Sequence, residues 1–218
     1  MASQTEENYL KALLTLSYNK EDVSISELSN LLNVRLPTVN SMVKNLKKQG
    51  LVNYEKYRPL SLTNEGKTKA ALILRKHRLT EMFLVEQMGF GWEEVHEIAE
   101  QVEHINSAVF FERMDELMGH PTIDPHGSPI PDKNGNMDLK NHLKLSEVKA
   151  GSNVKLVAIV NDTSDFLSYL NKKGLKLEME MKVVEVEPFD KSMNVSYPDH
   201  EQELLSQEVC NLLYVEVL

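Results

Sequence analysis

The spacing of hydrophobic and polar residues predicts three short helices within the first 50 residues. In each stretch apolar residues recur every three or four positions, which places them on one face of a helix. The stretches are 5–16, 24–34 and 35–50. Thr5 stands as a cap before the first helix, Ser24 or Ser26 leads into the second, and Pro37 and Gly50 fit the start and end of the third.

The pattern changes after Gly50, where residues 51–63, "LVNYEKYRPLSLT", alternate and are rich in Val, Tyr, Leu and Thr. Alternation of this kind predicts a β-hairpin, with its tip at 56–59. A helix, a helix-turn-helix and a hairpin in this order are typical of a winged-helix domain.

Two longer helices are predicted next, at 64–88 and 92–118. Residues 119–146 are rich in Pro and Gly, which disfavours a long regular element and indicates a linker. From Leu145 onward short strands follow, with a brief helix at 162–174, as in a small β-barrel. The predicted fold class is α+β with several domains: a winged helix-turn-helix, a helical domain and a small barrel.

The composition excludes some classes of protein and of metal site. No apolar run among the 218 residues approaches the roughly 20 that a membrane span needs, and no signal peptide is recognisable, so we expect a cytoplasmic protein without a membrane partner. The single cysteine, Cys210, allows neither an internal disulfide nor a cysteine zinc cluster, and beside an apolar strand it is expected to be buried. Any metal site must therefore use His, Asp, Glu, Asn, Met or backbone oxygen.

The net charge of −9 hides an asymmetry along the chain. Residues 1–80 contain 13 Lys or Arg against 7 Asp or Glu, whereas the remaining residues contain 11 against 26. A basic N-terminal part can face phosphate, and an acidic remainder can collect cations.

The third helix and the hairpin carry side chains of the kinds that contact DNA. Such side chains donate to phosphates or read base edges when a helix enters the major groove, and a wing adds backbone contacts. The predicted DNA-binding residues are Arg35, Pro37, Thr38, Asn40, Ser41, Lys44, Lys56, Tyr57 and Arg58. The alternative is an ordinary solvated helix face.

Acidic residues and histidines gather in "VHEIAEQVEH", residues 95–104. Glu100, Glu103 and His104 stand at i, i+3 and i+4 and therefore share one helical face, with His96 one turn earlier. Carboxylates this close repel each other, so a divalent cation would relieve the arrangement. The alternative is the charged surface of an amphipathic helix.

A second pair, His77 and Glu81, stands at i and i+4 on the preceding helix. Metal sites in helical proteins recur as such pairs on facing helices, which strengthens the metal hypothesis. The other histidines lie in loops or polar stretches and are expected on the surface. They are His120, His126, His142 and His200.

Four stretches together make the sequence resemble a known family. They are "RKHRLTEMFL", "VHEIAEQVEHINS", the wing "YEKYRPLSLT" and the linker "DPHGSPIP". With them the chain resembles the diphtheria toxin repressor family of metal-dependent transcription factors, over almost its whole length. The resemblance implies a winged helix-turn-helix DNA-binding domain at 1–63, a helical metal-binding and dimerisation domain with the linker at 64–142, and an SH3-like (FeoA-like) domain at 143–218.

The resemblance also implies two metal sites. The primary site would take one ligand from the first helix and three from the long helix, which fall on Asn8, Glu100, Glu103 and His104. The ancillary site would use His77, Glu81, His96, Asp162 and Asp165. Asp124 matches a position that supplies an additional ligand in some relatives.

Two departures from the family pattern bear on the metal. Iron-type members carry Met and Cys where this chain has Asn8 and Glu100, so an oxygen-rich site for Mn2+ or Fe2+ is implied. Manganese-type members usually have Asp at the position of Asn8, and some have Glu at the position of Lys11. An ammonium cannot ligate a metal, which argues against the binuclear variant of the site.

The expected function is that of a homodimeric, non-enzymatic repressor, activated by Mn2+ or Fe2+, that binds a palindromic double-stranded operator and controls metal-homeostasis genes. The dimer interface is expected at the apolar stripe of Val109, Phe110, Met114 and Leu117, unless these residues belong to the intramolecular core. Two alternatives are a winged-helix regulator that senses a small organic effector and a helical metalloenzyme.

Overall fold

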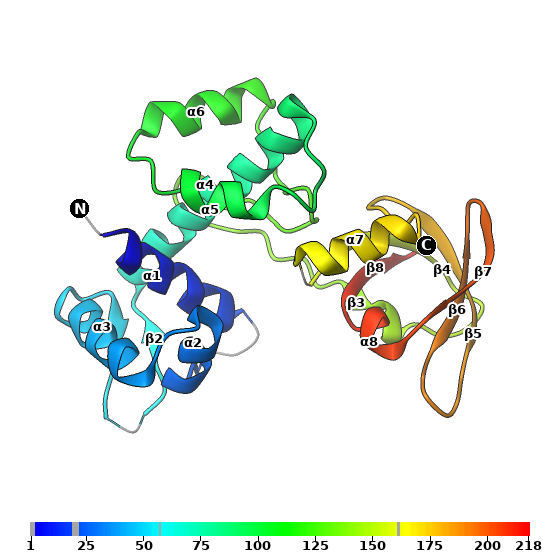
Figure 1. Ribbon diagram of the computed structural model, residues 1–218, viewed down its shortest axis with the longest axis horizontal. Coiled ribbons are helices and arrows are strands. Elements are labelled where there is room, and N and C mark those ends of the chain that lie inside the picture. The colour runs from blue at the N-terminus through cyan, green and yellow to red at the C-terminus, as the bar shows by residue number, and fades with distance from the viewer. Residues whose placement is uncertain (1–2, 19–21, 57, 161) are drawn as a thin grey trace. The chain divides into compact units, whose positions relative to one another are not determined.

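The computed structural model describes residues 3–18, 22–56, 58–160 and 162–218 (Figure 1). The chain folds as two compact units. The first comprises Met1–Thr80, Ile98–Thr122 and Ile130–Asp138, and the second comprises Glu81–Glu97, Ile123–Pro129 and Leu139–Leu218.

The first unit begins with three helices, α1 (Gln4–Ser17), α2 (Ile25–Leu32) and α3 (Leu36–Lys48). The cap of α1 is Ser3, so the expectation that Thr5 caps this helix is wrong. Ser3 and Glu6 form a capping box in which each side chain accepts a hydrogen bond from the other residue's backbone N–H. This arrangement satisfies two backbone donors that the helix itself leaves unpaired.

The turn between α2 and α3 follows from local sequence. Ser24 caps α2, as one of the two expected candidates, and Asn33 ends it with a φ of 50°, in the left-handed region that asparagine tolerates. Pro37 stands in the first turn of α3, where its missing N–H costs nothing. The expected helix-turn-helix is therefore present.

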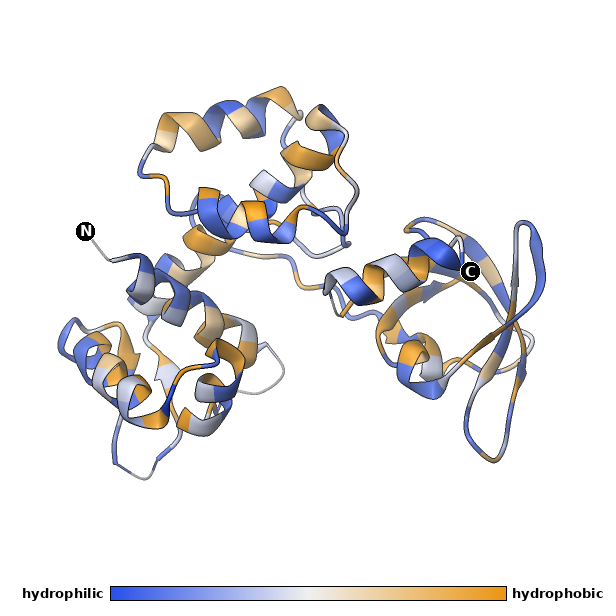
Figure 2. Ribbon diagram, in the orientation of Figure 1, coloured by the Kyte–Doolittle hydropathy of each residue, from blue (hydrophilic) through white to orange (hydrophobic). Residues whose placement is uncertain are grey.

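The hairpin after α3 consists of β1 (Val52–Asn53) and β2 (Ser61–Leu62), antiparallel, with Val52 opposite Leu62. The long helix α4 (Asn64–Met88) follows and has the predicted bounds. Hydrophobic residues of α1, α2, α3 and the hairpin form one core. Its fully buried members include Leu10, Leu13, Leu28, Val39, Val43, Leu46 and Leu60. Figure 2 shows by colour that hydrophobic and hydrophilic residues alternate along these helices.

The prediction of one continuous helix at 92–118 is wrong, because two separate helices occupy this range. They are α5 (His96–Val102) and α6 (Ala108–Leu117). Ser107 interrupts the helical pattern as the cap of α6, since its hydroxyl accepts from the backbone N–H of Phe110. Glu103 and His104 consequently lie in a turn just after α5.

The predicted linker contains no helix or strand within residues 119–142, apart from an isolated bridge between Ile123 and Pro129. The second unit then forms a six-stranded antiparallel sheet in the order β3-β8-β4-β5-β6-β7. The strands are β3 (Leu143–Lys144), β4 (Asn153–Ile159), β5 (Glu180–Val186), β6 (Met193–Tyr197), β7 (His200–Leu205) and β8 (Leu213–Val217).

Three short helical segments accompany this sheet: η1 (Leu145–Glu147), α7 (Ser164–Lys172) and α8 (Gln207–Cys210). Apolar residues of the sheet and of α7 pack into one core, which includes the buried Cys210 as expected. Burial raises the pKa of the Cys210 thiol to about 12, so the group is unreactive near neutral pH.

The observed architecture confirms the expected α+β fold class, with an N-terminal winged helix-turn-helix, a helical middle part and a C-terminal SH3-like sheet. The division at residues 63 and 142 stays a prediction. No helix in the described part of the chain is both long enough and apolar enough to cross a membrane.

Candidate metal centre

Helix α1 presents one polar face that carries Glu7, Asn8 and Lys11. The opposite face of this helix, with Leu10 and Leu13, is buried in the core of the helix-turn-helix. Asn8 and Lys11 stand at i and i+3 and therefore share a face. The segment that holds the DNA-binding unit together thus also brings a carboxylate, that of Glu7, and an ammonium, that of Lys11, to the turn after α5. The amide of Asn8 stands on the same face of α1.

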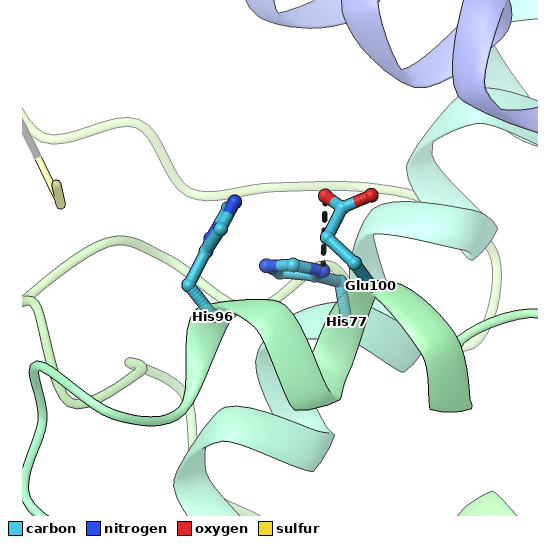
Figure 3. Close-up of side chains that lie close together, drawn as sticks. All are labelled: His77, His96 and Glu100. Atoms are coloured by element: carbon cyan, nitrogen blue, oxygen red, sulfur yellow. Dashed lines mark ion pairs between the residues drawn. The ribbon is translucent and has the colours of Figure 1, made fainter. Parts of the chain in front are cut away.

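Glu103 is the buried centre of this cluster, with a side chain that is 0% exposed. Its Oε2 accepts a hydrogen bond from Nζ of Lys11 at 2.7 Å and lies 2.6 Å from Nδ1 of His77. Lys11 also donates to Glu100, and Nδ1 of His77 lies 3.8 Å from Oε1 of Glu100. Figure 3 draws this last ion pair together with His96, which stands one turn before Glu100 on α5.

His104 is held from α1. Its Nδ1 donates to Oε2 of Glu7 at 2.6 Å, and its Nε2 lies 3.7 Å from Oε1 of Glu103. A histidine that gives its Nδ1–H to a carboxylate keeps the lone pair of Nε2 for a metal ion. His104 is therefore oriented as a ligand would be, with Nε2 on the side of Glu103.

Two of the candidate ligands have a buried oxygen without a hydrogen-bond partner in the described part of the chain: Oδ1 of Asn8 and Oε1 of Glu103. Leaving such an atom unsatisfied costs about 1 to 3 kcal/mol, so each needs an explanation. An amide oxygen, carboxylate oxygens and an imidazole nitrogen form a donor set that suits a divalent transition metal of borderline hardness. The residues present therefore fit the metal that the sequence implies.

A second set of metal-binding side chains surrounds Glu81 in the other unit. Nδ1 of His96 lies 3.5 Å from Oε1 of Glu81 and 3.6 Å from Oδ2 of Asp162. Potential ligand atoms of these three residues all lie within 4.8 Å of one another. The structure thus brings together three of the residues expected at the ancillary site.

Asp124 and His126 form a further group with the same Glu81, and all three residues are buried. His126 is 3% exposed, so the expectation of a surface histidine is wrong. Its loop packs closely against β4, because a Cβ on Gly127 would lie 2.2 Å from the carbonyl oxygen of Val157. Burial through such long-range packing leaves no mark in the local sequence pattern.

The charge state of His126 depends on Glu81. Burial by itself lowers the pKa of His126, but the hydrogen bond to Glu81 and the charges of Asp124 and Glu81 outweigh it and raise the pKa to about 9. Nε2–H of His126 donates a hydrogen bond of 3.0 Å to the carbonyl oxygen of Trp92. The protonated, positively charged form of His126 is therefore favoured in the metal-free chain.

The remaining predicted ligands are placed differently. His77 contacts Glu103 and Glu100, residues of the primary set. Asp165 is exposed in the first turn of α7 and belongs to none of the metal-binding groups found among the described residues. Two residues of these clusters, Glu7 and His126, are not predicted from the sequence. Each stands within two residues of a predicted ligand, and that proximity is the signal that would have found them.

Most of the predicted DNA-binding side chains are exposed. In and beside α3 these are Arg35, Pro37, Thr38, Ser41 and Lys44, and in the hairpin they are Lys56 and Arg58. Asn40 is only half-exposed, because its Oδ1 accepts a hydrogen bond from the Tyr54 hydroxyl at 3.2 Å. Tyr57 lies outside the described residues.

The stripe expected at a dimer interface is exposed in part. Val109, Phe110 and Leu117 of α6 are 63%, 39% and 68% exposed. Met114 is 6% exposed, so its assignment to the exposed stripe is wrong. It lies one turn after Phe110, on the side of α6 that faces the interior together with Phe111.

Three family models match successive parts of the chain. Residues 1–60 match the iron dependent repressor N-terminal DNA binding domain, residues 63–132 match the iron dependent repressor metal binding and dimerisation domain, and residues 143–217 match the FeoA domain. Together they account for the helix-turn-helix, the helices of the candidate metal centre and the C-terminal sheet.

Individual relatives agree with these matches. The iron-dependent repressor IdeR of Mycobacterium leprae is 31% identical over 97% of this chain and 96% of its own, and the diphtheria toxin repressor of Corynebacterium efficiens is 34% identical over 58% and 55%. A solved manganese-dependent transcriptional repressor in complex with manganese superposes with a TM-score of 0.89 at 29% identity, over 97% of this chain and 99% of the other. The repressor ScaR with bound Zn2+ gives 0.82 at 33% identity, over 98% and 99%. The chain therefore belongs to the iron-dependent repressor family, a family of DNA-binding transcriptional regulators and not of enzymes.

Proposed function

We propose that this chain is a cytoplasmic, homodimeric repressor that binds operator DNA when Mn2+ or Fe2+ is bound, and that it controls metal-homeostasis genes. One observation carries the proposal. A helix that is packed into the DNA-binding core, α1, also contacts the candidate ligands at the end of α5, through Glu7 and Lys11.

The primary site would be held by Asn8, Glu100, Glu103 and His104. When bound, the ion supplies positive charge that compensates the carboxylates and the unpaired oxygens of Asn8 and Glu103. Asn8 contributes its oxygen from α1, while the other ligands stand on or just after α5, so occupation of the site fixes α1 against that turn. Glu7 holds His104 in the orientation that leaves Nε2 available.

The ancillary site would be built around Glu81, with His96 and Asp162 on one side and Asp124 and His126 on the other. His77 would support the primary site through Glu103, although the family resemblance places it at the ancillary one. Asp165 is a proposed member of this site on the family resemblance alone.

DNA would be read by α3, with the hairpin as a wing on the phosphate backbone. Arg35, Thr38, Ser41 and Lys44 are exposed and of suitable chemistry. Pro37, Asn40, Lys56, Tyr57 and Arg58 complete the proposed DNA-binding set. A symmetric dimer through α6 would present two such helices to a palindromic operator.

The choice of Mn2+ or Fe2+ follows from the donors. The primary set contains two carboxylates, one amide oxygen and one imidazole, and no sulfur ligand. The relatives of this chain include repressors named for iron and for manganese. The three predicted domains, 1–63, 64–142 and 143–218, would then serve DNA binding, metal binding with dimerisation, and support of the ancillary site.

The proposal is tested by titrating the full-length chain against DNA selected from a random pool in the presence of Mn2+. Binding is measured at one stated salt concentration without metal and with Mn2+, Fe2+ or Zn2+, because protein–DNA affinity depends steeply on salt. We expect tight binding only with metal, through a coupling of about 1 to 3 kcal/mol or more between the two ligands.

Two variants, Glu103→Gln and His104→Ala, should abolish the response to Mn2+, while His142→Ala, which removes a histidine of the C-terminal part, should not change it. If the native chain bound this DNA equally tightly with and without metal, the metal-switch proposal would be wrong. A regulator that senses an organic effector would then be the better hypothesis.

A further inference from the structure

The ammonium of Lys11 stands inside the candidate primary site. Its Nζ donates to Oε2 of Glu103 at 2.7 Å and to Oε1 of Glu100, and it lies 3.4 Å from Nδ1 of His77. The Lys11 side chain is 13% exposed, and that of Glu103 is 0% exposed. A positive charge of the chain itself thus occupies a cluster of metal-binding groups.

The two oxygens of Glu103 differ in what surrounds them. Oε2 is bonded to Lys11 and His77, whereas Oε1 is buried without a hydrogen bond and lies 3.7 Å from Nε2 of His104. The ammonium of Lys11 therefore occupies one side of the Glu103 carboxylate. On the other side, the unsatisfied Oε1 lies near Nε2 of His104. The second side is where an incoming cation finds unpaired ligands.

We propose that Lys11 is a built-in counter-cation that sets the metal threshold of this centre. In the metal-free chain it compensates Glu100 and Glu103, because a buried carboxylate without a partner is strongly destabilising. A divalent ion that binds to the same two carboxylates must share them with the ammonium or displace it. Repulsion between the two cations at such short range lowers the affinity for the metal.

This inference rests on the proposed function. It predicts that removal of Lys11 changes the metal affinity in the opposite direction from that expected of a purely structural role. If Lys11 only held α1 against α5, its removal would loosen the site and weaken metal binding. If Lys11 is a counter-cation, its removal destabilises the metal-free chain and strengthens metal binding. The Lys11 ammonium has no lone pair for a metal ion, so it acts through its charge.

The test uses three substitutions in the full-length chain. Lys11→Gln and Lys11→Leu remove the charge, the second with an apolar side chain that has no ligand atom, and Lys11→Arg keeps the charge. Lys69→Gln serves as the control, because Lys69 forms an exposed ion pair with Glu65 on α4. Mn2+ affinity is measured by titration calorimetry, and the stability of the metal-free chain by thermal melting.

We expect Lys11→Gln and Lys11→Leu to bind Mn2+ about tenfold more tightly than the native chain or better, because the competing charge is gone. Both should have a lower melting temperature before metal is added. Lys11→Arg should resemble the native chain, and Lys69→Gln should change neither quantity. The Mn2+ concentration that half-saturates DNA binding should fall in parallel for the two uncharged variants. If either variant needs metal to fold, the Mn2+ concentration at half refolding serves as the affinity measure.

Equal or weaker Mn2+ binding by both uncharged variants would overturn the proposal for Lys11 while leaving the metal-dependent function standing. Failure of the native chain to bind Mn2+ or Fe2+ would instead overturn the proposed function. The two failures are therefore distinguished by the native chain alone.

Discussion

Oε1 of Glu6 accepts a hydrogen bond of 2.6 Å from Nε2 of Gln49, the C-cap residue that directly follows α3. Asn45 of the same helix donates to this oxygen as well, at 2.7 Å. The next residue of α1, Glu7, accepts from His104 in the turn after α5. Two carboxylates one peptide bond apart thus connect the proposed recognition helix and the proposed metal centre to the same turn of α1.

Substitution of Glu6 should therefore uncouple metal binding from DNA binding. Glu6→Ala removes both hydrogen bonds to α3 and half of the capping box, which should destabilise the chain by about 1 to 3 kcal/mol. The Mn2+ affinity should stay within about twofold, since a change of about 0.4 kcal/mol or less is expected at a site that keeps its ligands. Affinity for operator DNA at saturating Mn2+ should fall, as measured by fluorescence anisotropy.

The control for this prediction is Glu65→Ala, which removes an exposed carboxylate of α4 and should leave both affinities unchanged. Unaltered DNA affinity of the Glu6 variant at saturating metal would show that the contact with α3 carries no coupling.

Hydrogen bonds from the Ser3 backbone, Gln49 and Asn45 lower the pKa of Glu6. Its contribution to stability is therefore complete above the ordinary carboxyl pKa, and it is lost as the pH falls from that value through the lowered pKa of the folded state.

Glu7 should control metal affinity through the orientation of His104. Removing a carboxylate that orients a metal-bound histidine typically costs 10- to 100-fold in affinity, so Glu7→Ala should weaken Mn2+ binding by about that factor. Glu7→Gln should lose less, because its amide oxygen can still accept the proton of Nδ1. Titration calorimetry gives the affinities, and Glu112→Ala, on the exposed side of α6, is the matched control. Equal affinities for the native chain and the alanine variant would remove Glu7 from this role.

The metal-free chain should lose stability in mild alkali through His126. Its folded pKa of about 9 lies above the ordinary value of 6.5, so the protonated imidazole stabilises the fold fully below pH 6.5, and this contribution disappears as the pH rises through about 9. Urea unfolding of the native chain and of His126→Gln, both without metal, should differ most at pH 6.5 and converge above pH 9. A difference that did not change with pH over this range would contradict the assignment.

The exposed part of α6 should be the surface that dimerises, since it belongs to the region that matches a metal binding and dimerisation domain. Phe110→Asp and Val109→Asp place a charge on residues that are 39% and 63% exposed in the single chain, so the monomer should still fold. Sedimentation should show dissociation, and DNA affinity should fall with it. Leu139→Asp, at a residue that is 58% exposed in the linker, is the control. A dimer that survived both α6 substitutions would move the interface elsewhere.

Local patterns of the sequence determined the secondary structure of the DNA-binding part and the spacing of the candidate ligands on α5. The helical spacing in α1 to α4, the alternation in 51–63 and the strands after Leu145 all predict elements that are present. The positions of Glu100, Glu103 and His104 also survive the break between α5 and α6, because a turn continues the helical path through Glu103. Each of these features depends on neighbours within a few residues.

Tertiary structure alone decided what surrounds those ligands. Lys11 lies 92 residues from Glu103 in sequence, and Glu7 lies 97 from His104, yet both pairs are hydrogen bonded. His126 is buried by a loop that packs on β4, and Met114 is buried although it shares a helix with the exposed Val109. A periodic pattern encodes which face of an element is apolar, but only packing decides which polar faces meet, and hence which cation a carboxylate finds.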